Sequence, residues 1–252
     1  MIKKIFLLII ISLIIQSCAN KKDLLYYQNV VEGSQDKINF LSTKVQINDI
    51  LYIKVSAIIP ESVEPFNINM NTTNSNNPST LRLLGYLVTE DGEIVFPILG
   101  NLKVKGLTPL EIQKNIAKLL NDSGYVKDPT VSVRIVNGKV TVLGEVNVPG
   151  TYSFDEQSIS FNQAIGYAGG LTINGVRKDV LLVREVDGLR TYTHLDLTSS
   201  DWTKTPYAYV KQNDVIIVNP NGPKIMTSGY LTNIGSVLGV ISIGLTLVLL
   251  FK

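Results

Sequence analysis

Two long apolar segments, one at each end, constrain the fold of this chain more than any other feature of its sequence. The first covers residues 5–15 and follows Lys3 and Lys4, and the second covers residues 231–251 without a charged side chain. Segments this apolar are placed in a membrane or belong to an export signal that is removed. The part of the chain that folds in water must therefore lie between them.

The N-terminal segment is typical of a secretory signal peptide. Two lysines precede about eleven mostly apolar residues, a run too short to span a bilayer. Ile15, Gln16 and Ser17 then lead to Cys18, and an aliphatic residue three positions before a cysteine, with a small residue directly before it, resembles the bacterial lipobox. The resemblance implies that residues 1–17 are removed and that Cys18 carries acyl chains, which anchor a protein permanently. The alternative is a plain signal peptide followed by an incidental cysteine.

The C-terminal segment predicts a transmembrane helix over residues 231–251. As an α-helix its 21 residues extend about 31 Å, close to the thickness of the hydrocarbon core of a bilayer. Small and hydroxylated residues recur every three or four positions and share one stripe of this helix: Thr232, Gly235, Ser236, Gly239, Ser242 and Thr246. Such a stripe favours close helix packing, tightest at Gly235 and Gly239, or contact with a water-filled lumen. The alternative is a single anchoring span whose glycines have no role.

The composition excludes several classes of protein. Hydrophobic residues make up 45% of the chain and charged residues 17%, which suits a globular core and not a disordered chain. Removal of Lys3 and Lys4 leaves equal numbers of basic and acidic side chains, so no electrostatic footprint for nucleic acid remains. A single cysteine and a single histidine, His194, argue against a disulfide framework and against zinc motifs with paired ligands.

Residues 44–136 carry the signals of a small mixed unit. Alternating apolar residues predict strands over 51–55 and 130–135, and a hairpin is expected over 85–97 with its turn at Asp91 and Gly92. Between them, Thr108, Pro109 and Glu111 have the spacing of a capping box with proline at the first helical position. The helix that begins there is expected to bury these apolar residues: Ile112, Ile116, Leu119 and Leu120.

A second unit is predicted over residues 139–219. Strands are expected at 140–146, 180–185 and 190–195 and after Asn213-Asp214. A second capping box at Ser160 and Gln163 predicts a short helix that Gly169 and Gly170 close. The segment around Asn213-Asp214 echoes the one around Asn48-Asp49, which indicates one weak repeat of a turn followed by a strand.

No motif for catalysis is found in the sequence. The carboxylate pairs Asp91/Glu93 and Asp155/Glu156 could serve sugar hydrolysis, but both lie at turn-like positions where exposed carboxylates are routine. His194 lies in an alternating strand segment and is expected to be an ordinary surface or inter-strand residue. We therefore expect no enzyme, no cofactor and no metal site.

These residues together resemble the outer-membrane polysaccharide export family, the Wza-like auxiliary lipoproteins. The polysaccharide export domain is resembled over residues 44–136, in the runs 47–51, 91–97 and 128–131. One SLBB domain, a β-grasp-like fold, is resembled over residues 139–219, in the runs 144–152 and 164–170. The resemblance implies an α+β fold of these two domains in that order, between a lipidated linker at 18–43 and the membrane helix at 231–251. With a single SLBB unit, the periplasmic stack is expected to be short.

The resemblance also implies a function. It predicts a homo-oligomeric ring whose body lies in the periplasm, anchored by lipid and crossing the outer membrane with one helix per subunit. Capsular polysaccharide or exopolysaccharide would pass through the lumen without hydrolysis, and an inner-membrane polysaccharide copolymerase would be the partner below. The terminal helix is more apolar than a strongly amphipathic pore-lining helix. The alternative hypothesis is therefore a membrane-anchored carbohydrate-binding or assembly lipoprotein that forms no pore.

Overall fold

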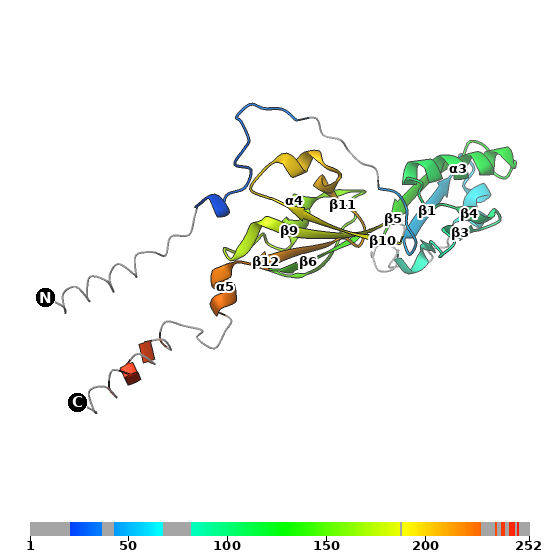
Figure 1. Cartoon of the computed structure of the whole chain (residues 1–252). Coiled ribbons are helices and arrows are strands. Elements are labelled where there is room, and N and C mark those ends of the chain that lie inside the picture. The colour runs from blue at the N-terminus through cyan, green and yellow to red at the C-terminus, as the bar shows by residue number, and fades with distance from the viewer. Residues whose placement is uncertain are drawn as a thin grey trace.

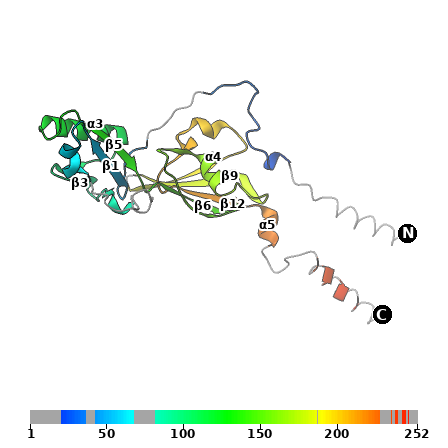
Figure 2. The same cartoon turned by 180° about the vertical axis from the view of Figure 1, so that it is seen from behind.

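The computed structural model shows two mixed units of helix and strand, arranged end to end (Figures 1 and 2). The structure describes residues 21–36, 43–67, 82–186 and 188–227, and within the C-terminal segment residues 235, 238, 239, 242–244 and 246. Each unit buries its own apolar cluster, one formed by residues 45–133 and one by residues 140–218. The predicted mixture of helix and strand is confirmed.

The first unit is built on a three-stranded antiparallel sheet of order β2-β1-β5. Its strands are β1 (Ile50–Ser56), β2 (Tyr86–Leu87) and β5 (Thr130–Ile135). Leu51, Ile53 and Val55 alternate into the core from β1, as their period of two predicts. The short helix η2 (Pro60–Phe66) follows β1 and buries Val63 and Phe66 in the same core.

The hairpin predicted over 85–97 is wrong in its pairing. Strand β2 pairs with β1, whereas β3 (Glu93–Phe96) pairs with β4 (Gly100–Lys103). Asp91 and Gly92 do form a tight turn, closed by a hydrogen bond from the Thr89 N–H to the Glu93 carbonyl at 2.9 Å. The two strands that flank this turn therefore belong to different sheets.

Helix α3 (Pro109–Asp122) begins as the capping box predicts. The Thr108 hydroxyl accepts from the Glu111 N–H, and the Glu111 carboxylate accepts from the Thr108 N–H at 2.7 Å. These hydrogen bonds lower the pKa of Glu111. Ile112, Ile116 and Leu120 are buried against the first sheet, as expected, but Leu119 is 41% exposed, so its assignment to the buried face is wrong.

The second unit contains a five-stranded sheet of order β10-β9-β12-β6-β7. Its strands are β6 (Lys139–Gly144), β7 (Gly150–Ser153), β9 (Gly175–Val186), β10 (Leu189–Leu195) and β12 (Val215–Pro220). Strand β12 runs parallel to β6 and antiparallel to β9. Gly144 ends β6 at φ +87°, and a Cβ there would lie 2.0 Å from the Val218 carbonyl oxygen, so glycine is required.

One face of this sheet is covered by short elements. They are β8 (Ile159–Ser160), α4 (Phe161–Tyr167), η3 (Asp201–Lys204), η4 (Pro206–Ala208) and β11 (Tyr209–Val210). The capping box of Ser160 and Gln163 opens α4, and Gly169 and Gly170 follow it with positive φ, as predicted. Phe161 packs edge-on against Trp202, with ring centroids 5.3 Å apart, in the centre of this core.

The two Asn-Asp segments are a true structural repeat. Asn48 and Asn213 both adopt the left-handed conformation, at φ 67° and 63°. In each turn the aspartate Oδ2 accepts a hydrogen bond of 2.8 Å from the N–H three residues earlier, Asp49 from Gln46 and Asp214 from Lys211. Asparagine serves here because its side chain tolerates positive φ better than other non-glycine residues.

Most of the C-terminal segment, including Thr232 and Ser236, lies outside the described residues. Gly235, Gly239, Ser242 and Thr246 are described and are helical. In the portions of the chain that the structure describes, no helix combines the length and the apolar character needed to cross a membrane.

Candidate functional site

Residues 26–29, which the sequence placed in a linker, are docked on the second unit. The Tyr27 ring stacks on Trp202 at 6.2 Å, and its hydroxyl accepts a hydrogen bond from the Asn162 amide. The Gln28 N–H donates to the Thr198 carbonyl at 2.7 Å. Asn29 accepts from the Ser200 N–H at 2.7 Å and donates to the Ser199 hydroxyl at 3.0 Å. We refer to residues 21–36 as the N-terminal strap.

Charged pairs fasten both ends of this strap. Lys178 pairs with Asp23 at 2.7 Å, and Lys204 pairs with Asp36 at 3.0 Å. All four side chains are about half exposed, so each pair alone contributes little. The strap therefore owes its position mainly to the Tyr27 stacking and to the hydrogen bonds of residues 27–29.

The strap begins at one end of the second unit. The C-terminal segment leaves the second unit at this same end. Its first element, η1 (Lys21–Asp23), contacts the start of β9. Helix α5 (Gly222–Thr227) directly follows β12, whose Pro220 is paired with Gly175 at the start of β9. Figure 1 shows η1 in blue and α5 in orange at this same end of the molecule. Cys18, the predicted lipidation site, lies outside the described residues, three positions before η1.

The predicted helix stripe is described at four positions. The Ser242 hydroxyl donates to the Gly239 carbonyl at 2.9 Å, and the Thr246 hydroxyl donates to the Ser242 carbonyl at 2.8 Å. These hydroxyls are satisfied within their own helix, an arrangement compatible with an apolar environment. An added Cβ at Gly239 would meet no atom of the described chain within 4 Å.

The two units are clamped together at their junction by Asn137 and Gln212. The Asn137 side chain accepts from the Ile50 N–H and donates to the Asn48 carbonyl, both at 2.9 Å. Its backbone carbonyl accepts from the Gln212 amide at 2.8 Å, and Gln212 accepts in turn from the Lys139 N–H at 3.1 Å. The repeated Asn-Asp turns therefore meet at the junction, one from each unit.

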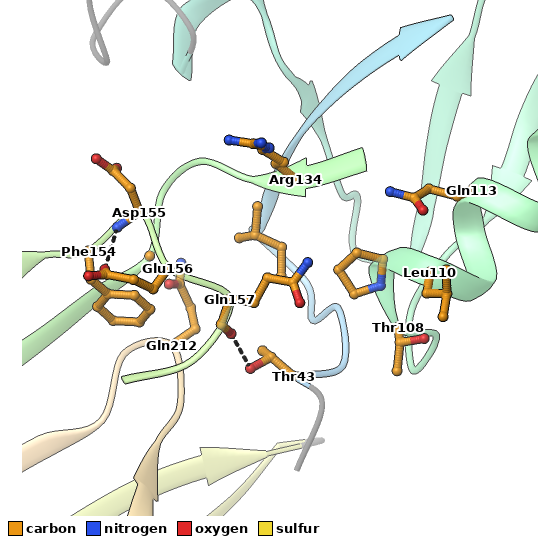
Figure 3. Close-up of a pocket in the computed structure, with 13 residues that line it drawn as sticks. Thr43, Thr108, Leu110, Gln113, Arg134, Phe154, Asp155, Glu156, Gln157 and Gln212 are labelled. Carbon is orange, nitrogen blue, oxygen red and sulfur yellow. Dashed lines mark hydrogen bonds between the residues drawn. The ribbon is translucent and has the colours of Figure 1, made fainter. Parts of the chain in front are cut away.

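A cavity of about 360 Å³ lies at this junction (Figure 3). Residues of both units line it: Thr43, Thr108, Pro109, Leu110, Gln113, Arg134, Ile135, Gly138, Phe154, Asp155, Glu156, Gln157 and Gln212. The Thr43 hydroxyl donates to the Gln157 carbonyl at 2.8 Å and gives a further contact between the units. No sequence pattern predicts this cavity, because its walls come from five separate segments that only the fold brings together.

The carboxylate pairs considered for catalysis have ordinary surroundings. Asp155 and Glu156 are exposed at the rim of the cavity, and the Glu156 carboxylate accepts from the Asp155 N–H at 3.2 Å. Burial, with Glu156 next to it, raises the pKa of the Tyr167 phenol. His194 is an exposed strand residue that contacts Asp179 on the neighbouring strand, as expected.

Two family models match the chain, in the order of its two units. Residues 42–136 match the polysaccharide biosynthesis/export protein family, and residues 139–193 match the SLBB domain. The chain is 33% identical over 120 residues to the EPS I polysaccharide export outer membrane protein EpsA of Ralstonia solanacearum. It is 36% identical over 104 residues to the protein of the same name from Ralstonia nicotianae.

These matches cover 45% and 40% of this chain but only 31% and 27% of the two relatives. The chain thus spans about three-tenths of the length of the relatives it matches. The names of both relatives support an outer-membrane location.

Proposed function

The chain belongs to the polysaccharide export family, and from that premise we propose that it is an outer-membrane lipoprotein for the export of exopolysaccharide or capsular polysaccharide. The observation that carries this proposal is the succession of the export domain and the SLBB domain on two separate cores. We assign residues 44–136 to the export domain, residues 139–219 to the SLBB domain and residues 231–251 to a membrane helix.

The anchor that we propose is Cys18, acylated after removal of residues 1–17. An extended chain reaches at most about 3.6 Å per residue, so Cys18 lies within about 11 Å of Lys21. Because the strap holds η1 against the start of β9, an acylated Cys18 would keep this end of the SLBB domain at the membrane surface. The export domain would then point into the periplasm.

The channel that we propose is a homo-oligomeric ring with one terminal helix per subunit. The face of the five-stranded sheet opposite α4 carries Val215, Ile217 and Leu181, with the 62% exposed Tyr192 beside them. Strands β7 and β10 are free edges of that sheet within the described chain. Open edges and an apolar sheet face suit contacts between neighbouring subunits.

We propose that the subunits catalyse no reaction on the polymer. Polymer would move through the lumen, and an inner-membrane copolymerase would deliver it from below. Helix α5 separates the terminal helix from the body of the subunit, and this arrangement is compatible with such a ring. It is equally compatible with the alternative, an anchored carbohydrate-binding or assembly lipoprotein without a pore.

Electron microscopy of the detergent-extracted protein tests this proposal. Rings with a central hole, together with loss of surface polysaccharide when the gene is deleted, are the expected result. Monomers or dimers would reject the channel and favour the alternative. Normal surface polysaccharide in the deletion strain would reject a role in export.

A further inference from the structure

We propose that the cavity between the two units binds one neutral pyranose unit of the exported polysaccharide. The inference rests on the proposed function for its ligand class, and on the lining of the cavity for its site. At about 360 Å³ the cavity lies near the lower end of the range of about 300–1,000 Å³ that is typical of small-molecule sites. Sites between domains are among the commonest positions for such ligands.

The lining has apolar and polar groups that complement the two kinds of surface of a sugar ring. Pro109, Leu110 and Phe154 offer apolar surface to the C–H faces of the ring. The side chains of Gln113, Arg134 and Gln157 offer donors and acceptors to its hydroxyl groups. Figure 3 shows Leu110 and Gln113 on one side of the cavity and Phe154, Asp155 and Glu156 on the other.

Three of these polar groups have hydrogen-bonding capacity to spare. Among the residues that the structure describes, no hydrogen-bond partner is found for the Gln113 amide, the Arg134 guanidinium or the Gln157 amide. Gln212 differs from them, because both ends of its amide are used in the junction clamp with Asn137 and Lys139. Gln113, Arg134 and Gln157 are therefore the groups that a hydroxylated ligand would engage, whereas Gln212 holds the wall in place.

The charge of the lining favours a neutral sugar over an acidic one. Arg134 faces the cavity from the first unit, but Asp155 and Glu156 stand at the opposite rim, so the ionised groups carry a net negative charge. Carboxylates accept hydrogen bonds from sugar hydroxyls and repel a uronate. The clamp fixes both walls before a ligand arrives, which reduces the entropic cost of binding.

Binding is tested on the full-length protein in detergent with four named probes. Saturation-transfer NMR and calorimetry are measured with methyl α-D-glucopyranoside, methyl β-D-galactopyranoside, N-acetyl-D-glucosamine and D-glucuronate. At least one neutral sugar is expected to bind, and to bind more tightly than D-glucuronate. Gln113→Ala and Arg134→Met should each weaken that binding tenfold or more. Lys114→Ala, at the exposed neighbouring position of α3, is the control and should bind as the wild type does.

Each contrary outcome is informative. No binding of any neutral sugar, equal binding by the cavity variants, or a preference for D-glucuronate would overturn the inference. Circular dichroism of each variant separates a lost site from a lost fold. If wild-type protein forms rings and exports polymer but binds no sugar, this inference fails and the proposed function stands. Wild-type protein that forms no rings would count against the channel, whatever the sugar result.

Discussion

The Arg184 guanidinium holds the Asp214 carboxylate in a buried bidentate pair, with Nε 3.0 Å from Oδ1 and Nη2 2.7 Å from Oδ2. The two side chains are 6% and 0% exposed. Burial raises the pKa of the Asp214 carboxyl, and Arg184 opposes this rise. Arg184 also donates to the Tyr209 carbonyl at 2.8 Å, so one guanidinium ties β9, the start of β11 and the second Asn-Asp turn together.

Arg184→Met should destabilise the second unit by about 3–5 kcal/mol, because it leaves a buried carboxylate without its partner. Trp202 is the only tryptophan of the chain and lies in the core of this unit, so its fluorescence follows urea unfolding. Arg190→Met is the matched control, since it breaks the exposed pair with Glu185 and should hardly move the midpoint. Equal midpoints for the two variants would contradict this reading of the pair.

Asp49 occupies the position of Asp214 in the first unit but lacks an arginine. Its Oδ2 accepts from the Gln46 N–H, whereas its buried Oδ1 has no hydrogen-bond partner in the described chain. Burial raises the pKa of the Asp49 carboxyl from 3.8 to about 6, and the Gln46 hydrogen bond opposes the rise. At pH values between 3.8 and about 6, the folded state therefore binds the proton of the Asp49 carboxyl more tightly than the unfolded state does.

The first unit should lose stability as pH rises from about 4 to about 6, by up to about 3 kcal/mol through Asp49. Asp49→Asn keeps an acceptor for the Gln46 N–H and cannot ionise, so its unfolding free energy should vary less over this range. Urea unfolding of residues 21–227 followed by circular dichroism at several pH values measures both. A wild type and a variant with parallel pH profiles would show that Asp49 does not titrate in this window.

The N-terminal strap should contribute to the stability of the second unit. Tyr27→Ala removes the ring stacked on Trp202, so the fluorescence of Trp202 should shift to longer wavelength and the free energy of unfolding should fall by about 1–3 kcal/mol. Val31→Ala is the control, since Val31 is 72% exposed on the same segment. An unchanged emission maximum in Tyr27→Ala would mean that the strap is not docked in solution.

Local signals predicted most of the secondary structure. Both capping boxes begin helices at the expected residues because each is closed by contacts three positions apart. The left-handed turns at Asn48 and Asn213 were also recognisable, since their aspartates bond within the same turn. By contrast, the turn at Asp91 and Gly92 gave no information about which strands pair, because β2 pairs with the distant strand β1 and β3 pairs with β4, which follows it.

The docked strap and the junction clamp depend on distant contacts. The sequence of the strap predicts a linker because it is mostly polar with one apolar cluster, whereas the residues that bind Asn29 lie some 170 positions away. The junction clamp joins Asn137 to residues on both units, and neither partner is marked by spacing. Such sites are found only after the two cores have been assembled.

The terminal helix provides the sharpest test of ring assembly. Gly239 lies on the small-residue stripe, and Gly244 lies about 140° away around the helix, on the opposite side. A Cβ at either glycine would meet no atom of the described chain within 4 Å, so replacement by leucine leaves contacts within this part of the subunit intact.

Gly239→Leu should insert into the membrane normally but fail to form oligomers and to export polymer, because a neighbouring helix is expected against that stripe. Gly244→Leu adds the same bulk on the other face and should behave as the wild type. Membrane-fraction abundance, oligomer size and surface polysaccharide are measured for both variants. Normal oligomers and export in Gly239→Leu would reduce the segment to a plain anchor, and equal failure of both variants would show that the stripe has no special role.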